Sequence, residues 1–345
     1  MNAPYRPSFV KPLDFGFVGW LEETNQYLLS ENPFSDETMV PAYPHKSCVQ
    51  LASVKAIRST SQDVTSGRCQ NVYQVGDHEV TVDFQNQKLH EVFGAGLRHL
   101  ELRTKPSTEL NYQFTIVDDT IRLFKNKSLI QEEPTYRYHY LQSLFANELI
   151  GAYNNVDRPD WLASFHASAV QMNDTALLLL GDSGSGKSTL AAILSASGFC
   201  CIADDLVLMR QSDSLIYPSP LGISVKAGSW QTLEHFYLNL KQIQNSSIQK
   251  KSQSIKYLPI HCRERPPTPM PCEHLVWVNF NPQSVFKIVP LTQFEALQKL
   301  IPDTWIAHSK ENAKQFLNWF VRAKSWSLSY SNYKEVLCWF KNLTH

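Results

Sequence analysis

Apolar and polar residues alternate along much of the first half of the chain. The alternation extends from about residue 47 to residue 131 in short stretches such as VYQVG, EVTVDF, FTIV and TIRLF, which Gly, Asp and Asn interrupt. A period of two is typical of strands with one buried face. We expect a strand-rich region here. Over residues 1–46 we expect an irregular arm rich in proline and aromatic residues, with one helix around residues 20–29.

The hydrophobic period changes to that of a helix beyond Pro134. The apolar positions at helical spacing are Leu141, Leu144, Phe145, Leu149 and Ile150. From about residue 158 strands and helices alternate: SFHASAVQ and ALLLLG predict strands, STLAAILSAS predicts a helix that ends at Gly198, and CCIADDLVLM predicts another strand. This alternation is typical of the α/β class.

The last third of the chain continues the alternation. HLVWVNF predicts a buried strand, helices follow near residues 292–301 and 309–323, and SWSLSY predicts a strand before a closing helix. The polar stretch QIQNSSIQKKSQSIK predicts a loop. We therefore expect an α/β protein of two domains. A smaller strand-rich α+β domain with its arm and linking helix covers residues 1–155, and a domain with a mixed sheet covers residues 156–345.

Composition and charge narrow the choice of partners. Lys plus Arg and Asp plus Glu number 32 each, so no overall field favours nucleic acid or an anionic membrane surface. No stretch approaches the roughly 20 apolar residues that span a bilayer, and the N-terminus has no secretory signal pattern. We expect a cytoplasmic protein with neither nucleic acid nor membrane as a partner.

The cysteines agree with a reducing compartment. There are seven, an odd number, and none forms a CxxC pair. Two of them lie near two histidines around the stretch RERPPTPMP, in a set that could offer four zinc ligands: His261, Cys262, Cys272 and His274. Because this spacing fits no zinc pattern, we expect a turn that leads into a strand.

A glycine-rich motif predicts the main chemistry. GDSGSGKS, at residues 181–188, matches GxxxxGK[ST] and lies directly between a predicted strand and a predicted helix, the context that this P-loop motif requires. Its glycines allow backbone amides to point inward, and the helix adds its positive end, which favours a phosphate group. The expected nucleotide-binding residues are Gly181, Asp182, Ser183, Gly184, Ser185, Gly186, Lys187, Ser188 and Thr189. Lys187 would reach the β- and γ-phosphates, and Ser188 would ligate Mg²⁺.

The same letters allow a second interpretation. GDSG also surrounds the nucleophilic serine of chymotrypsin-like proteases, with Ser183 in that role. A triad would leave Gly186, Lys187 and Ser188 without a purpose, so we favour phosphate binding.

A pair of carboxylates follows closely. Asp204 and Asp205 end the strand after the P-loop helix, seventeen residues beyond Lys187. Strands of such a unit end at the same edge of the sheet, so the pair should lie beside the phosphates. There one carboxylate can hold Mg²⁺ while the other accepts the proton of an attacking hydroxyl. A turn or a helix cap is the simpler alternative.

His166 can be placed by counting. A two-residue turn at Asn173 and Asp174 would set Met172 opposite Thr175, and on the same count His166 opposite the first residue of the P-loop. His166 would then lie at the mouth of the loop, where it could contact the γ-phosphate or tune the aspartates. A slip of one residue would turn it to the other face and leave an ordinary histidine on a sheet.

Together, His166, GDSGSGKS and IADD resemble the HPr kinase/phosphorylase superfamily, whose nucleotide fold is shared with phosphoenolpyruvate carboxykinase. The order and close spacing of these motifs are the specific part, and YPSPLGISVKAGSW, HLVWVNF and PLTQFEALQKL look like its divergent HPr-kinase-related branch. The resemblance covers about residues 160–340. It implies a P-loop, phosphoenolpyruvate carboxykinase-like kinase domain. By position it implies that Asp204 is the general base, that Asp205 is a metal ligand beside Ser188, and that His166 and Lys187 lie near the transferred phosphoryl group.

The sequence also departs from that family. Thr189 stands where a glutamate usually follows the P-loop serine, and the family's glutamate- and glycine-rich signature is missing after the acid pair. HPr is therefore in doubt as the substrate. Lys226, in SVKAG, could face the nucleotide, although a solvated lysine is the simpler expectation.

We accordingly expect an ATP- and Mg²⁺-dependent kinase that phosphorylates a Ser or Thr hydroxyl of a protein or peptide. Two alternatives stay open: a kinase for a small-molecule hydroxyl, and a regulatory protein that binds nucleotide and signals its bound state. The resemblance also allows a homo-oligomer. The sequence does not identify the phosphate acceptor.

Overall fold

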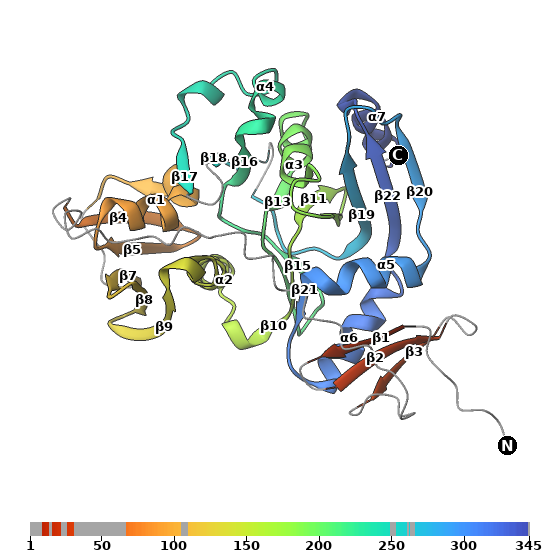
Figure 1. The fold of residues 1–345 in the computed structure, drawn as a ribbon, viewed down its shortest axis with the longest axis horizontal. Coiled ribbons are helices and arrows are strands. Elements are labelled where there is room, and N and C mark those ends of the chain that lie inside the picture. Colours follow the sequence, from red (N-terminus) through yellow and green to blue (C-terminus); the bar gives the residue numbers. More distant parts are fainter. Residues whose placement is uncertain are drawn as a thin grey trace.

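The computed structural model describes residues 9–13, 16–21, 26–30, 67–104, 110–248, 253–260, 262 and 266–343. Its elements form a mixed α/β protein with several sheets. Two six-stranded sheets carry most of the core, and Figure 1 places them in separate halves of the molecule. We call them the N-terminal sheet and the central sheet.

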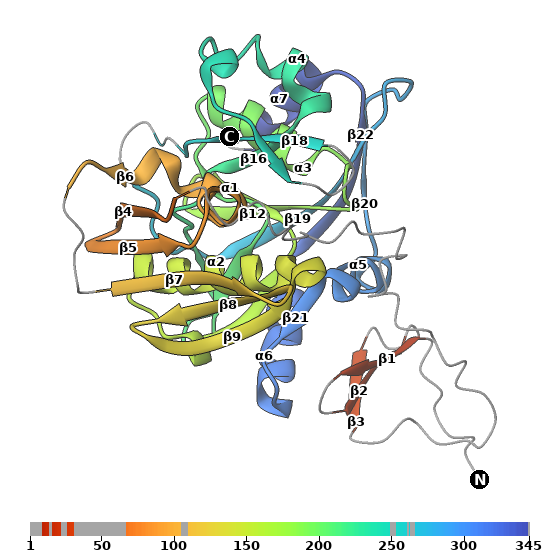
Figure 2. The same cartoon turned by 60° about the vertical axis from the view of Figure 1, so that its left-hand side comes forward.

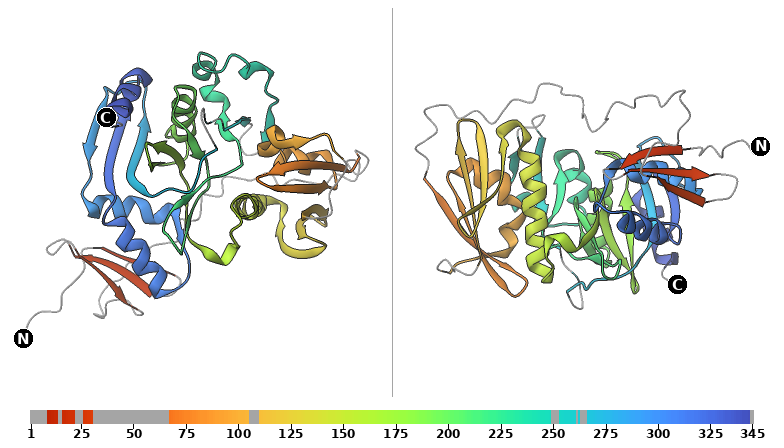
Figure 3. Two further views of the ribbon diagram at one scale, coloured as in Figure 1. Left: turned by 180° about the vertical axis from the view of Figure 1, so that it is seen from behind. Right: turned by 90° about the horizontal axis from the view of Figure 1, so that it is seen from below.

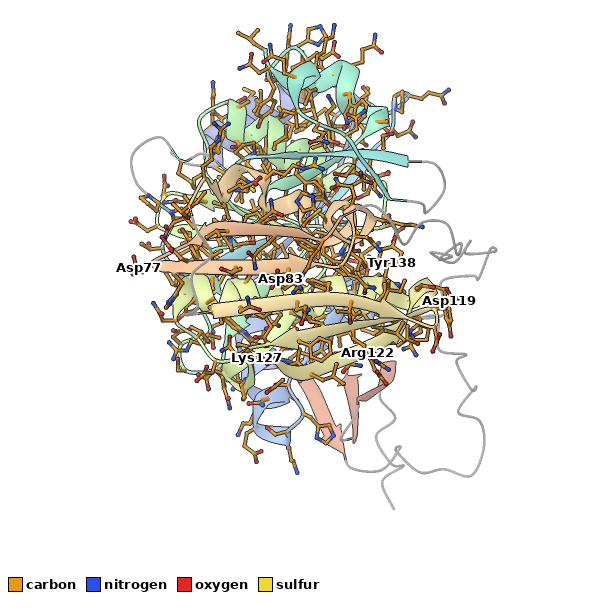
Figure 4. All side chains as sticks on the ribbon, turned by 90° about the vertical axis from the view of Figure 1, so that its left-hand side faces the viewer. Asp77, Asp83, Asp119, Arg122, Lys127 and Tyr138 are labelled. Atoms are coloured by element: carbon orange, nitrogen blue, oxygen red, sulfur yellow. A yellow bond between two sulfur atoms is a disulfide. The ribbon has the colours of Figure 1, made fainter. Side chains whose placement is uncertain are left out.

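The N-terminal sheet is built mainly from hairpins. Its strands in spatial order are β6 (Glu101–Leu102), β4 (Cys69–Val75), β5 (His78–Phe84), β7 (Leu110–Val117), β8 (Thr120–Lys125) and β9 (Ser128–Pro134). Two of its turns hold consecutive residues with positive φ, at Asp118 and Asp119 and at Asn126 and Lys127. That conformation suits tight hairpins because its twist matches that of the strands. Figure 4 shows Asp119 and Lys127 at opposite ends of the strands, with Asp83 and Arg122 between them.

One face of the N-terminal sheet packs against two helices. These are α1 (Gln87–Phe93) and α2 (Tyr138–Asn154), whose apolar sides join the strands in one buried cluster. At its centre Phe114 stacks on Phe93 at 4.1 Å between ring centroids and meets Phe145 edge-on at 5.0 Å. The cluster therefore fixes both helices against the same strand.

The central sheet contains parallel and antiparallel strands. Its order is β13 (Cys201–Ala203), β11 (Ser168–Met172), β12 (Thr175–Leu180), β19 (Cys272–Phe280), β22 (Lys324–Tyr330) and β20 (Lys287–Pro290). The strands β12, β19 and β22 are mutually parallel. Both β13 and β12 pair antiparallel with β11, so β12, β13, β19 and β22 end at the same edge, while β11 and β20 run the other way.

Helices cover both faces of this sheet, as the two views in Figure 3 show. One face packs against α3 (Lys187–Ala196), α4 (Trp230–Leu233) and α7 (Tyr333–Leu343). The other packs against α5 (Gln293–Leu300) and α6 (Lys310–Phe320). Buried on both sides, β12 and β19 read as continuous apolar runs, which is the pattern of a covered parallel sheet.

Three smaller sheets complete the described chain. One joins β15 (Ile216–Tyr217), β14 (Val207–Arg210), β10 (Trp161–Phe165) and β21 (Thr304–Ile306). A second joins β16 (Ile223–Lys226), β18 (Gln253–Leu258) and β17 (Ser246–Ile248). The third, β1 (Phe9–Leu13), β2 (Gly16–Leu21) and β3 (Gln26–Ser30), lies near α6 in Figures 1 and 2.

Most of the predicted elements are present. The α/β class is confirmed, and the predicted helix behind Pro134 is α2. The predicted pairing of Met172 with Thr175 is also confirmed, although the ladder ends at Ser168 and Leu179 and does not reach His166. The division into domains at residue 155 stays a prediction, although α2 ends at Asn154.

Three expectations were wrong in part. The helix around residues 20–29 is instead the end of β2 and most of β3, whose Val, Trp, Tyr and Leu favour a pleated surface. The polar loop contains β17 and most of β18, because β18 pairs with β16 as well as with β17. SFHASAVQ and CCIADDLVLM are each two strands in different sheets, broken at His166 and at Asp204 and Asp205. The rest of the arm lies outside the described residues.

The cysteines also differ from expectation. Cys200 and Cys262 form a disulfide between the start of β13 and the segment before β19, so one pair exists where we expected none. Of the four residues weighed as zinc ligands, His261 lies outside the described residues. Within the described part of the chain, no three His, Cys, Asp or Glu side chains gather as a metal site. In that same part no helix has both the length and the apolar character needed to cross a membrane.

The aromatic centre of the N-terminal sheet should dominate the stability of that region. Replacing Phe114 by Ala removes a fully buried ring from three aromatic contacts and should lower the free energy of unfolding by about 3–5 kcal/mol. Val117→Ala, at a half-exposed position of the same strand, should change it by less than about 0.5 kcal/mol. Urea unfolding of the full chain measures both, and equal effects would contradict the packing described here.

Candidate functional site

The site lies where β12 meets α3 at the edge of the central sheet. The connecting residues 181–188, which we call the glycine-rich loop, contain three glycines with positive φ, at 128°, 92° and 101°. At Gly181 a Cβ would collide with the Val278 carbonyl at 2.8 Å, and at Gly186 it would make a tight contact with Phe280 Cβ at 3.1 Å. The positive φ at both positions also favours glycine. The loop thus turns tightly and delivers backbone amides to the N-terminus of α3, an arrangement that suits an anion.

Lys187 is folded back over this loop. Its Nζ donates to the carbonyls of Gly181 at 2.6 Å and Asp182 at 3.2 Å, and the residue is only 7% exposed. Burial lowers the pKa of Lys187, and the nearby charges of Asp205 and Asp204 oppose that shift. A buried ammonium is thereby held at the mouth of the loop.

Asp204 is the buried member of the acid pair. It is 3% exposed, and both carboxylate oxygens accept hydrogen bonds: Oδ1 from Ser168 Oγ at 2.6 Å, and Oδ2 from the Ser224 amide at 2.8 Å and Oγ at 3.0 Å. Ser188, at the start of α3, is a further hydrogen-bond partner. Burial, and then the charge of Asp205, raise the pKa of Asp204, while these hydrogen bonds lower it.

Asp205 faces the opposite situation. It has a positive φ of 69°, and its side chain is 68% exposed. His166 Nδ1 lies 3.2 Å from its carboxylate and 3.2 Å from its carbonyl, so that nitrogen carries a proton. Although the side chain is open to the cavity, the surrounding protein partly desolvates it, which acts to raise the pKa of Asp205. The hydrogen bond and charge of His166, with the charges of Lys187 and Lys226, outweigh this effect and lower the pKa. The same hydrogen bond raises the pKa of His166 against its own desolvation.

Lys226 brings a second cation to the loop. Its Nζ donates to Ser183 Oγ at 3.2 Å, from the last position of β16. Because alternate residues of a strand share a face, Lys226 and Ser224 point the same way, one to the glycine-rich loop and the other to Asp204. The simpler expectation of a solvated lysine is therefore incomplete: the side chain is exposed but contacts the loop.

Two further features of the loop suit a nucleotide and its metal ion: a buried polar atom without a partner, and oxygen atoms that could bind Mg²⁺. Ser185 Oγ is buried and has no hydrogen-bond partner, so it is a polar atom inside the loop that a phosphate oxygen could satisfy. Oxygen ligands for Mg²⁺ are present in the Ser188 hydroxyl and the Asp204 and Asp205 carboxylates. The donor set is therefore of the right chemical kind.

A cavity of about 1090 Å³ opens in front of these residues. Its walls come from both halves of the molecule. On the side of the central sheet it is lined by charged residues: His166, Lys187, Asp204, Asp205, Lys226 and Asp303. On the side of the N-terminal sheet it is lined by residues of α1, the following 3-10 helix and α2, among them Phe93, Gly96, His139, Gln142 and Leu149, and none of these lining residues is Asp, Glu, Lys or Arg. The reactive groups therefore lie on one wall and face a wall without carboxylates, lysines or arginines, which we call the neutral wall.

The structure brings the predicted site residues together. The glycine-rich loop, Asp204, Asp205 and His166 line one cavity, as the spacing of the motifs predicted. One detail differs, because β11 lies between β12 and β13 and the acids are not on the strand next to the loop. His166 follows the end of β10 rather than lying within a strand, and its amide donates to the Asp303 carbonyl at 3.1 Å.

Two features of the site were not predicted from the sequence. One is the pair of serines that hydrogen-bond to Asp204, and the other is the neutral wall of the cavity. Ser168 lies two residues after His166, so strand alternation could have placed both on one side of the chain. Nothing in the sequence signals that Ser224 meets Asp204, because Ser224 lies twenty positions further along the chain and in a separate sheet.

Comparison with known proteins gives little to add to this geometry. No protein-family model matches the sequence, and no curated protein matches it. Among solved structures, the Hpr(Ser) kinase/phosphatase from Coxiella burnetii aligns over 52% of this chain and 87% of its own, with 9% identity and a TM-score of 0.25. At that TM-score the similarity does not establish a shared fold.

The pairing of His166 with Asp205 should be visible in titrations. In buffer free of divalent cations, the pKa of His166 should lie above its ordinary value of about 6.5 and should fall in Asp205→Asn, because the acceptor's charge is lost while burial stays. NMR of the histidine ring measures this directly, and Asp213→Asn is a control far from the ring. The contribution of the pair to stability is fully present between the ordinary pKa of aspartate and the ordinary pKa of histidine. It is lost as the pH falls through the lowered pKa of Asp205 or rises through the raised pKa of His166. An unchanged His166 pKa in Asp205→Asn would contradict the pairing.

Proposed function

We propose that this chain is an ATP-dependent phosphotransferase that transfers the γ-phosphoryl group to the hydroxyl of a Ser or Thr in a protein or peptide. One observation carries the proposal: a tight glycine-rich loop with a buried lysine and two carboxylates line a single cavity. Phosphoryl transfer needs little covalent chemistry from the protein and depends on such positioning and charge.

In this proposal the glycine-rich loop is a P-loop. Its amides, with Ser183, Ser185 and Thr189, hold the phosphates, and Lys187 turns from the loop carbonyls to the β- and γ-oxygens. A magnesium ion bound by Ser188 would neutralise the charge that develops between those phosphates. Lys226 adds a second positive charge from the other side of the loop, through the contact that it already makes with Ser183.

The geometry favours a division of the acid pair opposite to the one that the family resemblance implies. A general base must reach the acceptor hydroxyl, and the exposed carboxylate of Asp205 can do so. Asp204 is buried, hydrogen-bonded at both oxygens and joined to Ser188, which suits a fixed ligand for the metal or its water. We therefore assign Asp205 as the base, His166 as the residue that positions it, and Asp204 as the metal ligand.

The finer fold assignment belongs to the same proposal. The order of strand, P-loop, helix and acid pair, with His166 beside them, is the pattern for which the sequence resembles the HPr kinase/phosphorylase superfamily and its phosphoenolpyruvate carboxykinase-like fold. The mixed order of the central sheet is compatible with that assignment.

A small-molecule hydroxyl is the second candidate acceptor. The neutral wall faces the reactive groups across the cavity, and a concave site between two parts of a protein is a usual form of small-molecule site. The same residues would perform the transfer, so only the acceptor differs.

The roles of the two acids can be separated by substitution. Asp205→Asn should abolish transfer, with a loss of at least about a hundredfold, while MgATP binds nearly as before. Asp204→Asn should weaken MgATP more than ATP measured in EDTA, because it removes a metal ligand. Calorimetric titrations and single-turnover assays measure these effects, with Asp174→Asn in the β11–β12 turn as a control. If Asp204→Asn retained metal-dependent binding but lost transfer, the roles would be the reverse.

The acceptor can be found by labelling. Full-length protein with γ-labelled ATP should label a macromolecule in a lysate or, for the second candidate, a compound in a protein-free metabolite extract. Lys187→Ala should do neither. A wild-type protein that shows no affinity for MgATP in calorimetry would refute the proposed function.

A further inference from the structure

Two half-exposed aromatic side chains lie on opposite sides of the glycine-rich loop. Phe280 ends β19, is 46% exposed and lines the cavity, although its strand lies inside the sheet. Trp305, on β21 and 50% exposed, lines the cavity near His166 and Asp303. An aromatic ring that is open to a cavity offers a ligand a large, flat apolar surface.

The strand order distinguishes the two sides. From β12 in one direction come β11 and β13, which bring His166 and the acid pair to the edge of the sheet. In the other direction come β19 and β22, which end at Phe280 and Tyr330. Neighbouring strands are about 4.8 Å apart, so the two groups flank the loop within the length of one nucleotide.

Phe280 is fixed to the loop by its backbone. Its amide donates to the Ser185 carbonyl at 2.9 Å, and its Cβ lies beside Gly186. Its ring meets Tyr330 at 5.5 Å between centroids with an interplanar angle of 65°, so Tyr330 supports it edge-on. One face of the Phe280 ring therefore has a rigid support, while nearly half of the residue stays open.

Two tyrosines extend this surface. Tyr330 is 2% exposed, and its Oη lies 3.4 Å from the position of a Cβ on Gly186, so the hydroxyl points at the first turn of α3. Tyr333, the first residue of α7, lines the same cavity and packs edge-on against Phe236 at 5.0 Å. Together Phe280, Tyr330 and Tyr333 form an aromatic patch at the end of the loop remote from the acids.

We infer that this aromatic patch binds the purine base of the nucleotide, with Phe280 as the stacking surface. The inference rests on the proposed function, because transfer requires the γ-phosphate to face Asp204 and Asp205. A triphosphate oriented in that way leaves the loop on the side of β19 and β22. On that side a flat, polarisable base would meet an open aromatic ring instead of charged groups. Stacking of this kind stabilises any nucleotide base, because every base has a π-face.

Calorimetry with two ligands tests the inference on the full-length protein. MgATP and magnesium tripolyphosphate share the phosphates, and only MgATP has a base. Phe280→Ala should weaken MgATP roughly tenfold or more while tripolyphosphate binds as in the wild type. Phe280→Trp should restore the MgATP affinity.

Two control variants make the result specific. Val285→Ala changes an apolar side chain that is 85% exposed in the loop after β19, and it should leave both affinities unchanged. Trp305→Ala removes the matching aromatic residue on the acid side, and it should also leave the MgATP affinity unchanged.

Three outcomes would overturn the inference. Phe280→Ala could leave MgATP binding unchanged, it could weaken both ligands equally, or Trp305→Ala could weaken MgATP in its place. A wild-type protein that binds neither ligand would instead refute the proposed function, so the two failures are distinguishable.

Discussion

The buried carboxylate of Asp204 is the constraint on which the site depends. An ionised group at 3% exposure is costly unless hydrogen bonds replace its water. Here Ser168 from β11 and Ser224 from β16 occupy both oxygens, and Ser188 joins them from α3. Elements β11, β16 and α3 must therefore lie around the Asp204 carboxylate and hydrogen-bond to it, which offsets the cost of burying its charge. Because α3 begins at the glycine-rich loop, the same contacts fix the position of that loop.

The local parts of this arrangement could be predicted from the sequence, and the long-range parts could not. The strand before the glycine-rich loop, the loop itself and α3 follow from one motif and the apolar runs beside it. The breaks at His166 and at Asp205 were missed because an apolar run with one polar interruption reads as a single strand. At Asp205 the φ of 69° ends β13 and lets β14 begin in another sheet. No local pattern encodes such a change of sheet.

Other differences have the same origin. The Cys200–Cys262 disulfide joins residues 62 apart, and its pairing depends on how the segment before β19 returns to β13. Lys226 looked solvated because an isolated lysine at a strand end usually is, whereas its contact with Ser183 exists only because β16 crosses the mouth of the loop. Tertiary placement, rather than residue type, decided each case.

The strand β16 also connects the two walls of the cavity. At one end Lys226 contacts the glycine-rich loop, in its middle Ser224 holds Asp204, and just before it the amide of Gly222 donates to the carbonyl of Gly96 at 3.1 Å. Gly222 cannot accept a side chain there, because a Cβ would lie 2.8 Å from the Leu258 carbonyl. The 3-10 helix at Ala95–Leu100 and Asp204 are therefore both hydrogen-bonded to the short segment from Gly222 to Ser224. One strand thus fixes the position of Asp204 and joins the two walls of the cavity.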